Sequence, residues 1–262
     1  MPTSIDRELL ARWPLPAPTG SKYDRGQVLV VGGSASAPGA AMLAGVASLR
    51  AGAGRLTLAV ADAVAAPVAV ALPECAVVPW GDSGAEASRA SAVLIGPGLD
   101  DPDETAALVD HLATQVDAET VIVLDAFALG VLPRLRSRDL LAGRLVLTPN
   151  REEAAILLGR ELGEELAELG TIAKKYGAVV SCFGHVAAPD SRVWIAGLPA
   201  QGLGTSGSGD VLAGAITGLA ARAEPDQAAV WGTWAHLRAG QLAGAPGYLA
   251  RELADALPRA LA

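Results

Sequence analysis

The chain has 262 residues, of which 51% are hydrophobic, and its formal net charge is −8. This negative charge argues against a nucleic-acid-binding surface, and Pro, Gly or charged residues interrupt every apolar run before it reaches membrane-spanning length. The length, with no low-complexity linker, favours one domain over residues 1–262. The hydrophobic residues are mainly Ala, Val and Leu, which suits strands buried on both faces and closely packed helices.

Cysteine content and the N-terminal segment bear on the compartment. Cys75 and Cys182 provide neither a disulfide framework nor the spacing of a metal site, which predicts reduced thiols in a cytoplasmic protein. The first 26 residues carry several charges and no continuous apolar segment, so we expect no secretory signal.

Strand-then-helix units repeat along the chain. A short helix over 5–13 precedes a buried strand over 27–31, an Ala-rich helix over 40–51 and a strand over 55–60. Further predicted strands cover 76–78, 91–95, 120–124, 144–147, 178–182 and 193–195; predicted helices cover 102–115, 126–132, 151–158, 162–176 and 226–243, and the type of 64–72 stays open. This alternation predicts an α/β fold with a doubly wound parallel sheet.

Small or polar residues follow five of these elements, and in an open α/β sheet ligands bind where the carboxyl ends of the strands meet their loops. The five positions are Gly32-Gly33-Ser34, Gly96-Pro97-Gly98, Asp125, Thr148-Pro149-Asn150 and the loop 202–210. Each alone is a turn by default. Together they predict one binding crevice.

The stretch 202–220 reads as a glycine-rich loop that leads into a helix. Four glycines between 202 and 209 let backbone N–H groups curl around an anion, and the start of a helix attracts phosphate. Asp210 opens the apolar helical run, either as a capping carboxylate or as a proton acceptor beside a bound anion. A cap does not require so many glycines, which favours the second interpretation.

This loop, G-T-S-G-S-G-D-V-L-A-G, resembles the anion-binding loop and catalytic aspartate of the ADP- or ATP-dependent NAD(P)H-hydrate dehydratases of the ribokinase-like superfamily. The resemblance covers nearly the whole chain, in the family's order and approximate spacing. It includes K-Y-D-R-G-Q-V-L-V-V-G-G-S (22–34), P-G-A-A (38–41), I-G-P-G-L (95–99), V-L-D-A (123–126) and L-T-P-N-x-x-E (147–153). It implies a three-layer α/β/α sandwich with a central, mostly parallel sheet.

The same resemblance implies roles for individual residues. Asp210 would be catalytic and would contact the hydrated nicotinamide nucleotide together with Ala40, Gly98 and Asn150. ADP or ATP would be the phosphate donor, with Mg²⁺ as cofactor. The residues implied to bind the adenine nucleotide are Thr205, Gly207, Ser208, Gly209, Phe183 and Gly184.

Asn150 and Glu153 form an N-x-x-E spacing at the start of a predicted helix. Relatives use this spacing to organise Mg²⁺ and phosphate, usually through water. The same spacing is also that of a capping box, in which each side chain bonds the other residue's backbone N–H. Both interpretations stay open, and they are compatible.

One departure from the family concerns the strand before the glycine loop, where a Leu-Lys-Gly is usual and the lysine contacts the adenine nucleotide. Phe183 stands in place of that lysine, and the loop is shorter. Loss of a charged hydrogen bond weakens binding by roughly 1–3 kcal/mol. Phe183 either stacks on a base or packs into the core, the commoner role, and His185 is a candidate for the missing positive charge.

Two other functions stay open: a small-molecule kinase of the same superfamily, acting on a hydroxymethylpyrimidine, a thiazole alcohol or a sugar, and a nucleotide-binding protein with weakened catalysis. The motifs G-G-S…P-G-A (32–40) and I-G-P-G-L (95–99) fit the dehydratases better than these alternatives. The implied partners are NADHX or NADPHX, an adenine nucleotide, a separately encoded NAD(P)H-hydrate epimerase and further copies of the chain, with a tetramer as the expected assembly. Trp231, Trp234 and His236 recur at helical spacing, which predicts packing or a subunit interface.

Overall fold

The computed structural model describes residues 1–17, 19–163, 167–199, 202–244 and 247–262. Its strands are β1 (Thr3–Ile5), β2 (Gln27–Val31), β3 (Arg55–Val60), β4 (Ala76–Pro79), β5 (Ala92–Ile95), β6 (Val121–Leu124), β7 (Leu145–Leu147), β8 (Ala178–Cys182), β9 (His185–Ala187) and β10 (Val193–Ala196). Its helices are α1 (Arg7–Arg12), α2 (Pro38–Arg50), α3 (Asp62–Ala71), α4 (Ser83–Ala87), α5 (Pro102–Ala113), α6 (Phe127–Val131), α7 (Arg138–Leu141), α8 (Arg151–Leu158), α9 (Ala167–Tyr176), α10 (Ser208–Ala220), α11 (Pro225–Ala243) and α12 (Ala250–Leu261).

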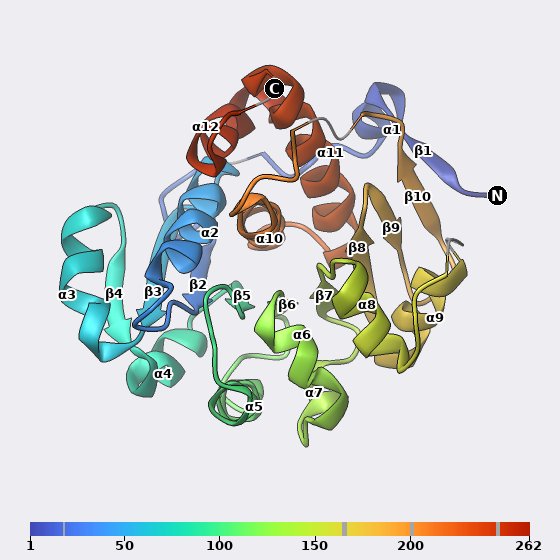
Figure 1. The fold of residues 1–262 in the computed structure, drawn as a ribbon. Coiled ribbons are helices and arrows are strands. Elements are labelled where there is room, and N and C mark those ends of the chain that lie inside the picture. The colour runs from blue at the N-terminus through green and yellow to red at the C-terminus, as the bar shows by residue number, and fades with distance from the viewer. Residues whose placement is uncertain (18, 164–166, 200–201, 245–246) are drawn as a thin grey trace.

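The strands form one sheet in the order β1-β10-β9-β8-β7-β6-β5-β2-β3-β4 (Figure 1). From β4 to β8 every neighbouring pair is parallel, whereas β9 runs antiparallel to both β8 and β10. The predicted mostly parallel sheet is therefore confirmed. The chain moves outward from β2 to β4 and then returns to β5 on the other side of β2, which makes this a switch point of the kind where α/β sheets bind ligands.

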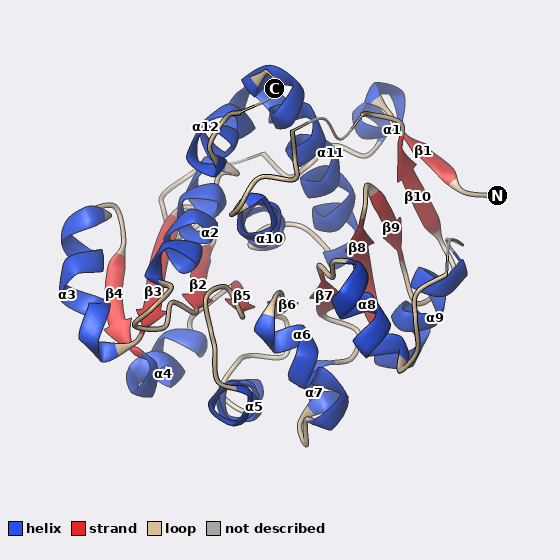
Figure 2. Cartoon of the chain, viewed as in Figure 1, coloured by secondary structure: helices blue, strands red, loops and turns tan. Residues whose placement is uncertain are grey.

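Helices cover both faces of the sheet, so the molecule has three layers (Figure 2). Successive strand residues point to opposite faces. Val28 and Val30 pack in the cluster that includes α2, α10, α11 and α12, whereas Leu29 and Val31 pack in the cluster that includes α5, α6, α8 and α9. This agrees with the expected α/β/α sandwich, and it explains why the strands read as continuous apolar runs.

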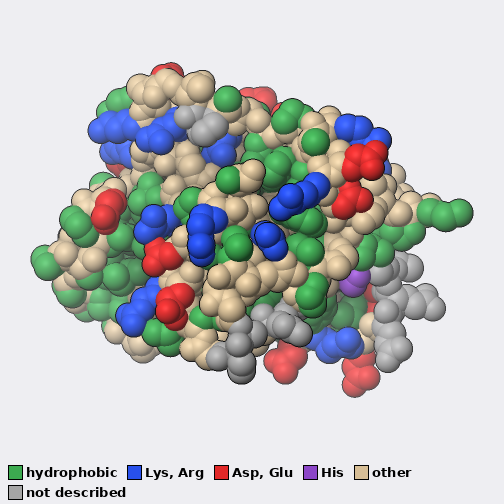
Figure 3. Space-filling view, turned by 90° about the horizontal axis from the view of Figure 1, so that it is seen from above, with side chains coloured by type: hydrophobic (Ala, Val, Ile, Leu, Met, Phe, Trp, Pro, Cys, Tyr) green, Lys and Arg blue, Asp and Glu red, His purple; other side chains and the backbone are tan. Residues whose placement is uncertain are grey.

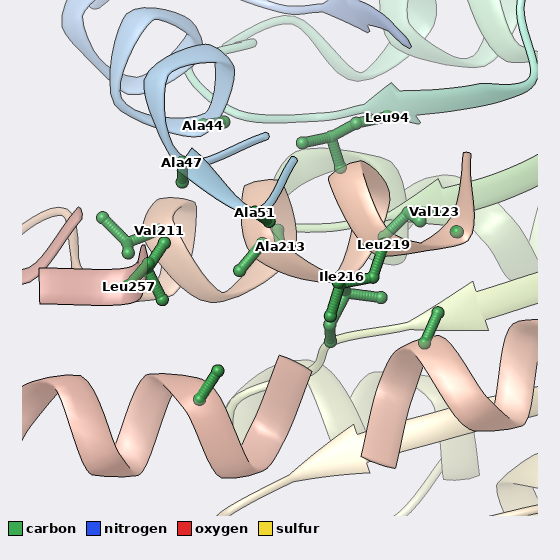
Figure 4. Packing of buried hydrophobic residues seen from close by; sticks show 14 of the residues in the cluster. Ala44, Ala47, Ala51, Leu94, Val123, Val211, Ala213, Ile216, Leu219 and Leu257 are labelled. Atoms are coloured by element: carbon green, nitrogen blue, oxygen red, sulfur yellow. The ribbon is translucent and has the colours of Figure 1, made fainter. Parts of the chain in front are cut away.

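Helices α2 and α10 pack with their backbones in close contact. A methyl group at Gly214 would lie 2.1 Å from the Ala44 carbonyl oxygen, and Ser48 Oγ donates a hydrogen bond to the Gly214 carbonyl oxygen at 2.9 Å. The middle of α10 is thereby held against α2. Figure 4 labels core residues from α2 (Ala44, Ala47), from the position directly after it (Ala51), from α10 (Val211, Ala213, Ile216, Leu219), from α12 (Leu257) and from strands β5 and β6 (Leu94, Val123).

Several element predictions needed correction. Ile5 was expected in a helix but lies in β1, because that segment pairs with β10 and the helix begins only after Asp6, whose side chain accepts a hydrogen bond from Leu9 N at 2.9 Å. The segment 64–72 lies largely within α3. Strand β9 (His185–Ala187) was not predicted; it forms by antiparallel pairing with β8. Of the expected helix 162–176, residues 164–166 lie outside the described residues, and α9 begins at Ala167.

The described helices include none long and apolar enough to cross a membrane. Figure 3 looks down on the side of the molecule where α11 and α12 lie, and there positive and negative side chains are interspersed with hydrophobic and polar ones.

Candidate functional site

The carboxyl ends of the central strands are aligned. The sheet register pairs Val31 with Ile95, Ile95 with Leu124, and Leu124 with Leu147, the last residues of β2, β5, β6 and β7. The loops that follow these strands therefore meet along one edge of the sheet. The structure thus brings together the strand-end motifs found in the sequence.

Two of these loops are joined by backbone hydrogen bonds at the switch point. Gly33 N donates to Pro97 O and Ser34 N donates to Gly98 O, both at 2.8 Å. Gly98 has φ +74°, and a methyl group there would lie 3.2 Å from Ala40 Cβ. Ala40 and Gly98, expected at the substrate, therefore lie side by side with little side-chain bulk between them.

The glycine-rich loop ends at Gly207, which has φ +87° and precedes the first residue of α10. The helix starts at Ser208, two residues before the expected start, so Asp210 is not its capping residue. Ser208 N donates to Thr205 O, and Val211 N donates to Gly207 O. As second and third residues of the helix, Gly209 and Asp210 have N–H groups without an acceptor in it, which leaves these amides available to an anion.

Asp210 is half-buried beside these amides. A methyl group at Gly207 would lie 3.8 Å from Asp210 Oδ2, so the carboxyl group folds back toward the start of the helix. Burial raises the pKa of Asp210 to about 6. A carboxylate with this pKa is ionised at neutral pH and is more basic than an exposed aspartate, as a proton acceptor should be.

Asp125 is a further carboxyl group at this edge, and it is 5% exposed. Burial raises its pKa to about 7, against the lowering effect of a 2.7 Å hydrogen bond from Thr148 Oγ1, and the nearby charges of Glu153 and Asp210 raise it further. Burial also raises the pKa of Glu153. Three carboxyl groups thus interact at one site. The sequence placed Asp125 at a strand end but gave no sign of its proton affinity, which depends on groups from other elements.

The Asn150–Glu153 capping box is confirmed. Asn150 N donates to Glu153 Oε2 at 2.8 Å, and Glu153 N donates to Asn150 Oδ1 at 2.9 Å. Within the described part of the chain, no three His, Cys, Asp or Glu side chains are grouped to hold a metal ion. Glu153 Oε1 lies outside the capping box. These donors fit Mg²⁺ only in its usual mode, bound by one or two carboxylates together with waters and substrate phosphates.

Phe183 and Gly184 form the two-residue turn between β8 and β9, in which Cys182 pairs with His185. Both turn residues have positive φ, +50° and +77°, as in a type I′ hairpin. This two-residue turn explains why the loop at Phe183 is shorter than is usual in the family. Phe183 is 60% exposed, so the expectation that it packs into the core was wrong. Burial lowers the pKa of His185, which disfavours the charged imidazole that would replace the missing cation.

His236 makes a contact with the first residue of α10 that the sequence did not reveal. It is buried in α11, and its Nε2 lies 2.9 Å from Ser208 O and 3.0 Å from Ser208 Oγ. Because a carbonyl oxygen only accepts, Nε2 carries the proton. Burial lowers the pKa of His236 to about 4. Helical spacing correctly predicted packing, but the contact with the first residue of α10 depends on a partner distant in sequence.

A family model described as NAD(P)H-hydrate dehydratase matches residues 28–259, which include every strand-end motif of this edge. The chain belongs to this family. Its membership agrees with the order of motifs in the sequence, and it places Asp210 and the glycine-rich loop within the matched region.

Members of the NAD(P)H-hydrate dehydratase family are similar over nearly the full chain. The ADP-dependent (S)-NAD(P)H-hydrate dehydratase of Xanthomonas campestris is 45% identical over 97% of this chain and 94% of its own. The Bacillus subtilis ADP/ATP-dependent NAD(P)H-hydrate dehydratase, co-crystallised with ATP/Mg²⁺, is 28% identical with a TM-score of 0.79, covering 94% of this chain and 92% of that one. The bifunctional NAD(P)H-hydrate repair enzyme of Moorella thermoacetica is 35% identical over 97% of this chain but only 54% of its own length.

Proposed function

We propose that this chain catalyses the ADP- or ATP-dependent dehydration of (S)-NAD(P)H-hydrate to NAD(P)H, and so repairs damaged nicotinamide nucleotides. The observation that carries the proposal is the position of Asp210. Its carboxyl group, with a pKa raised to about 6, lies beside N–H groups of the first turn of α10 that have no acceptor within the helix. A proton acceptor therefore adjoins a phosphate-binding element.

The reaction divides into two steps. Asp210 accepts the proton of the C6 hydroxyl as that oxygen attacks the terminal phosphorus of the nucleotide, and the bond from this phosphorus to its bridging oxygen breaks. The C6–O bond then breaks with phosphate as leaving group. Electrons from the ring nitrogen assist, and loss of a proton from the adjacent ring carbon restores the dihydropyridine. Phosphorylation is needed because hydroxide is a poor leaving group.

Other residues bind and orient the two ligands. In this proposal the backbone of the loop, at Thr205, Gly207, Ser208 and Gly209, holds the nucleotide phosphates and stabilises charge during transfer. Ala40 and Gly98 leave room for the nicotinamide ring because neither has a long side chain. Asn150 contacts the same substrate from the neighbouring strand end.

Glu153 and Asn150 would hold Mg²⁺, largely through water, and the bound ion would neutralise charge on the nucleotide phosphates. In our proposal the capping box orients Glu153 for this purpose, since Oε2 is fixed by Asn150 N and Oε1 is left for the ion. Phe183 and Gly184 lie at the β8–β9 turn, where we place the remaining contacts with the adenine nucleotide.

The proposed cellular setting follows from the reaction. An NAD(P)H-hydrate epimerase would supply the S form of the substrate. We expect a cytoplasmic homo-oligomer, with a tetramer as the assembly to be tested by light scattering. Family membership favours the dehydratase over a hydroxymethylpyrimidine, thiazole or sugar kinase.

The test is a coupled measurement of NADHX consumption, recovery of reduced-nicotinamide absorbance and phosphate release, with ADP or ATP and Mg²⁺. Asp210→Asn should retain the fold and lose about 10²–10⁴-fold in turnover, as removal of a general base does. Asp139→Asn is the matched control, because its side chain is 96% exposed on α7, away from the site. Near-native activity of Asp210→Asn would remove the assignment. Nucleotide binding without turnover in the unmodified protein would favour the binding-protein alternative.

A further inference from the structure

An exposed aromatic ring and a cation lie together at the carboxyl edge of the sheet. The guanidinium carbon of Arg151 is 5.8 Å from the centre of the Phe183 ring, within the range of cation–π attraction. The β8–β9 turn holds Phe183 at φ +50°, a conformation unfavourable for a side chain of this size, and leaves 60% of it exposed. Core packing does not account for this arrangement.

The position of Arg151 is also unfavourable for helix stability. It is the first residue of α8, where the helix dipole favours acidic side chains and disfavours a cation. No ion pair joins Arg151 to a carboxylate among the residues that the structure describes. Its charge therefore remains available to an anion from solution.

Helix α11 connects this pair to the glycine-rich loop. His236 bonds to Ser208, the first residue of α10. The next residue, Leu237, has Cδ1 3.4 Å from the position that a methyl group at Gly184 would occupy. The β8–β9 turn and the first residue of α10 thus contact consecutive residues of α11. If an anion binds at the start of α10, Arg151 and Phe183 lie on the side of that anion that faces the β8–β9 turn.

We propose that Arg151 binds the phosphates of the adenine nucleotide and that the Phe183 ring holds the guanidinium group in place. The inference rests on the proposed function, and it adds a specificity residue to it. Arg151 distinguishes a nucleotide by its phosphate charge and takes no part in proton transfer. A guanidinium group suits this role because its planar fork can bind two phosphate oxygens at once.

The test measures dissociation constants by calorimetry, with Mg²⁺, for ADP, AMP and adenosine. Arg151→Gln should weaken ADP binding by about tenfold or more, the effect of losing a charged hydrogen bond, and leave adenosine binding unchanged. Arg151→Lys should recover part of the affinity, since it keeps the charge but not the fork. Phe183→Leu should weaken ADP binding by a smaller factor, because the guanidinium group remains but is less ordered.

Arg138→Gln is the matched control. Arg138 is a partly exposed arginine of α7, and its replacement changes the net charge equally. It should leave ADP binding unchanged. The affinity of the unmodified protein for ADP should fall more steeply with salt than that of Arg151→Gln, because one phosphate contact is missing in the variant.

The outcomes separate this inference from the proposed function. Unchanged ADP affinity in Arg151→Gln, with ADP binding by the unmodified protein, would overturn the role of Arg151 and leave the enzyme assignment intact. Equal losses for ADP and adenosine would also overturn it, since a phosphate contact cannot act on adenosine. Failure of the unmodified protein to bind any adenine nucleotide would remove both proposals. Thermal unfolding without ligand checks the fold of each variant.

Discussion

Thr148 Oγ1 donates a 2.7 Å hydrogen bond to Asp125 Oδ1 and thereby joins the carboxyl ends of β7 and β6. Both side chains are buried. A buried carboxyl group is tolerated when it has a hydrogen-bond donor or keeps its proton. Asp125 meets both conditions. Thr148 is its hydrogen-bond donor, and burial raises its pKa to about 7, which favours the protonated form.

The first prediction concerns this hydrogen bond. Thr148→Val should lower the free energy of unfolding by about 1–3 kcal/mol, because it leaves a buried polar group without its donor. Denaturant titrations above and below the pKa of Asp125 measure the effect, which should be larger where the group is ionised. Thr114→Val, at the exposed end of α5, is the control and should be nearly neutral. Equal stability of Thr148→Val and the unmodified protein would contradict the buried hydrogen bond.

The second prediction is a pH dependence of stability. The folded-state pKa of Asp125, about 7, is above its unfolded value, so its contribution is fully present below the unfolded pKa and is lost as pH rises toward the folded pKa. Asp125→Asn removes this loss, since an amide does not ionise. The variant's stability relative to the unmodified protein should therefore rise between about pH 4 and pH 7. A difference that stays constant across this range would show that Asp125 does not titrate there.

The third prediction concerns catalysis. Asp210 must be deprotonated to accept the hydroxyl proton, and its pKa is raised to about 6. The value of kcat/KM should therefore increase with pH up to that region and then level off. Because Asp125 interacts with Asp210, the inflections belong to the interacting pair. A profile that stays flat below the pKa of Asp210 would contradict its role as base.

The sequence predicted which strand-end residues meet at the carboxyl edge of the sheet. Parallel strands place their carboxyl ends together, so Gly98, Asp125 and Thr148 were expected near one another from the strand pattern alone, and the register confirms this. The capping box could be predicted from the sequence because its two residues, Asn150 and Glu153, are only three positions apart.

Other features depend on pairings that are not local. Core packing was the commoner of the two roles considered for Phe183, but its exposure is set by a two-residue turn that exists only because β9 pairs with β8. The contact between His236 and Ser208 joins two helices across 28 positions. The raised pKa of Asp125 depends first on burial by surrounding elements and then on the charges of Glu153 and Asp210. Neither residue type nor spacing signals such contacts.

The fourth prediction separates the two roles of Glu153. A glutamine can keep the capping box, so Glu153→Gln should change the unfolding free energy by less than about 0.5 kcal/mol. If the carboxylate also holds Mg²⁺, this variant should need more Mg²⁺ for half-maximal activity. Asn150→Ala removes the cap and should cost about 0.5–2 kcal/mol. An unchanged Mg²⁺ requirement in Glu153→Gln would exclude the carboxylate as a metal ligand.

The fifth prediction tests the backbone contact between α10 and α2. In Gly214→Ala the added methyl group would lie 2.1 Å from the Ala44 carbonyl oxygen, so α10 and α2 must move apart. This should lower the free energy of unfolding by about 1–3 kcal/mol. ADP affinity should fall as well, because α10 carries the phosphate-binding amides and Asp210.

Gly170→Ala is the matched control for this substitution. Gly170 lies inside α9 with no atom within 4 Å of the added methyl group, and alanine is the better helix former, so the variant should be more stable by up to about 1 kcal/mol. Chemical denaturation and calorimetry with ADP measure both variants. A Gly214→Ala protein as stable as Gly170→Ala would mean that α2 and α10 are not in backbone contact, and that another element fixes Asp210 beside the phosphate loop.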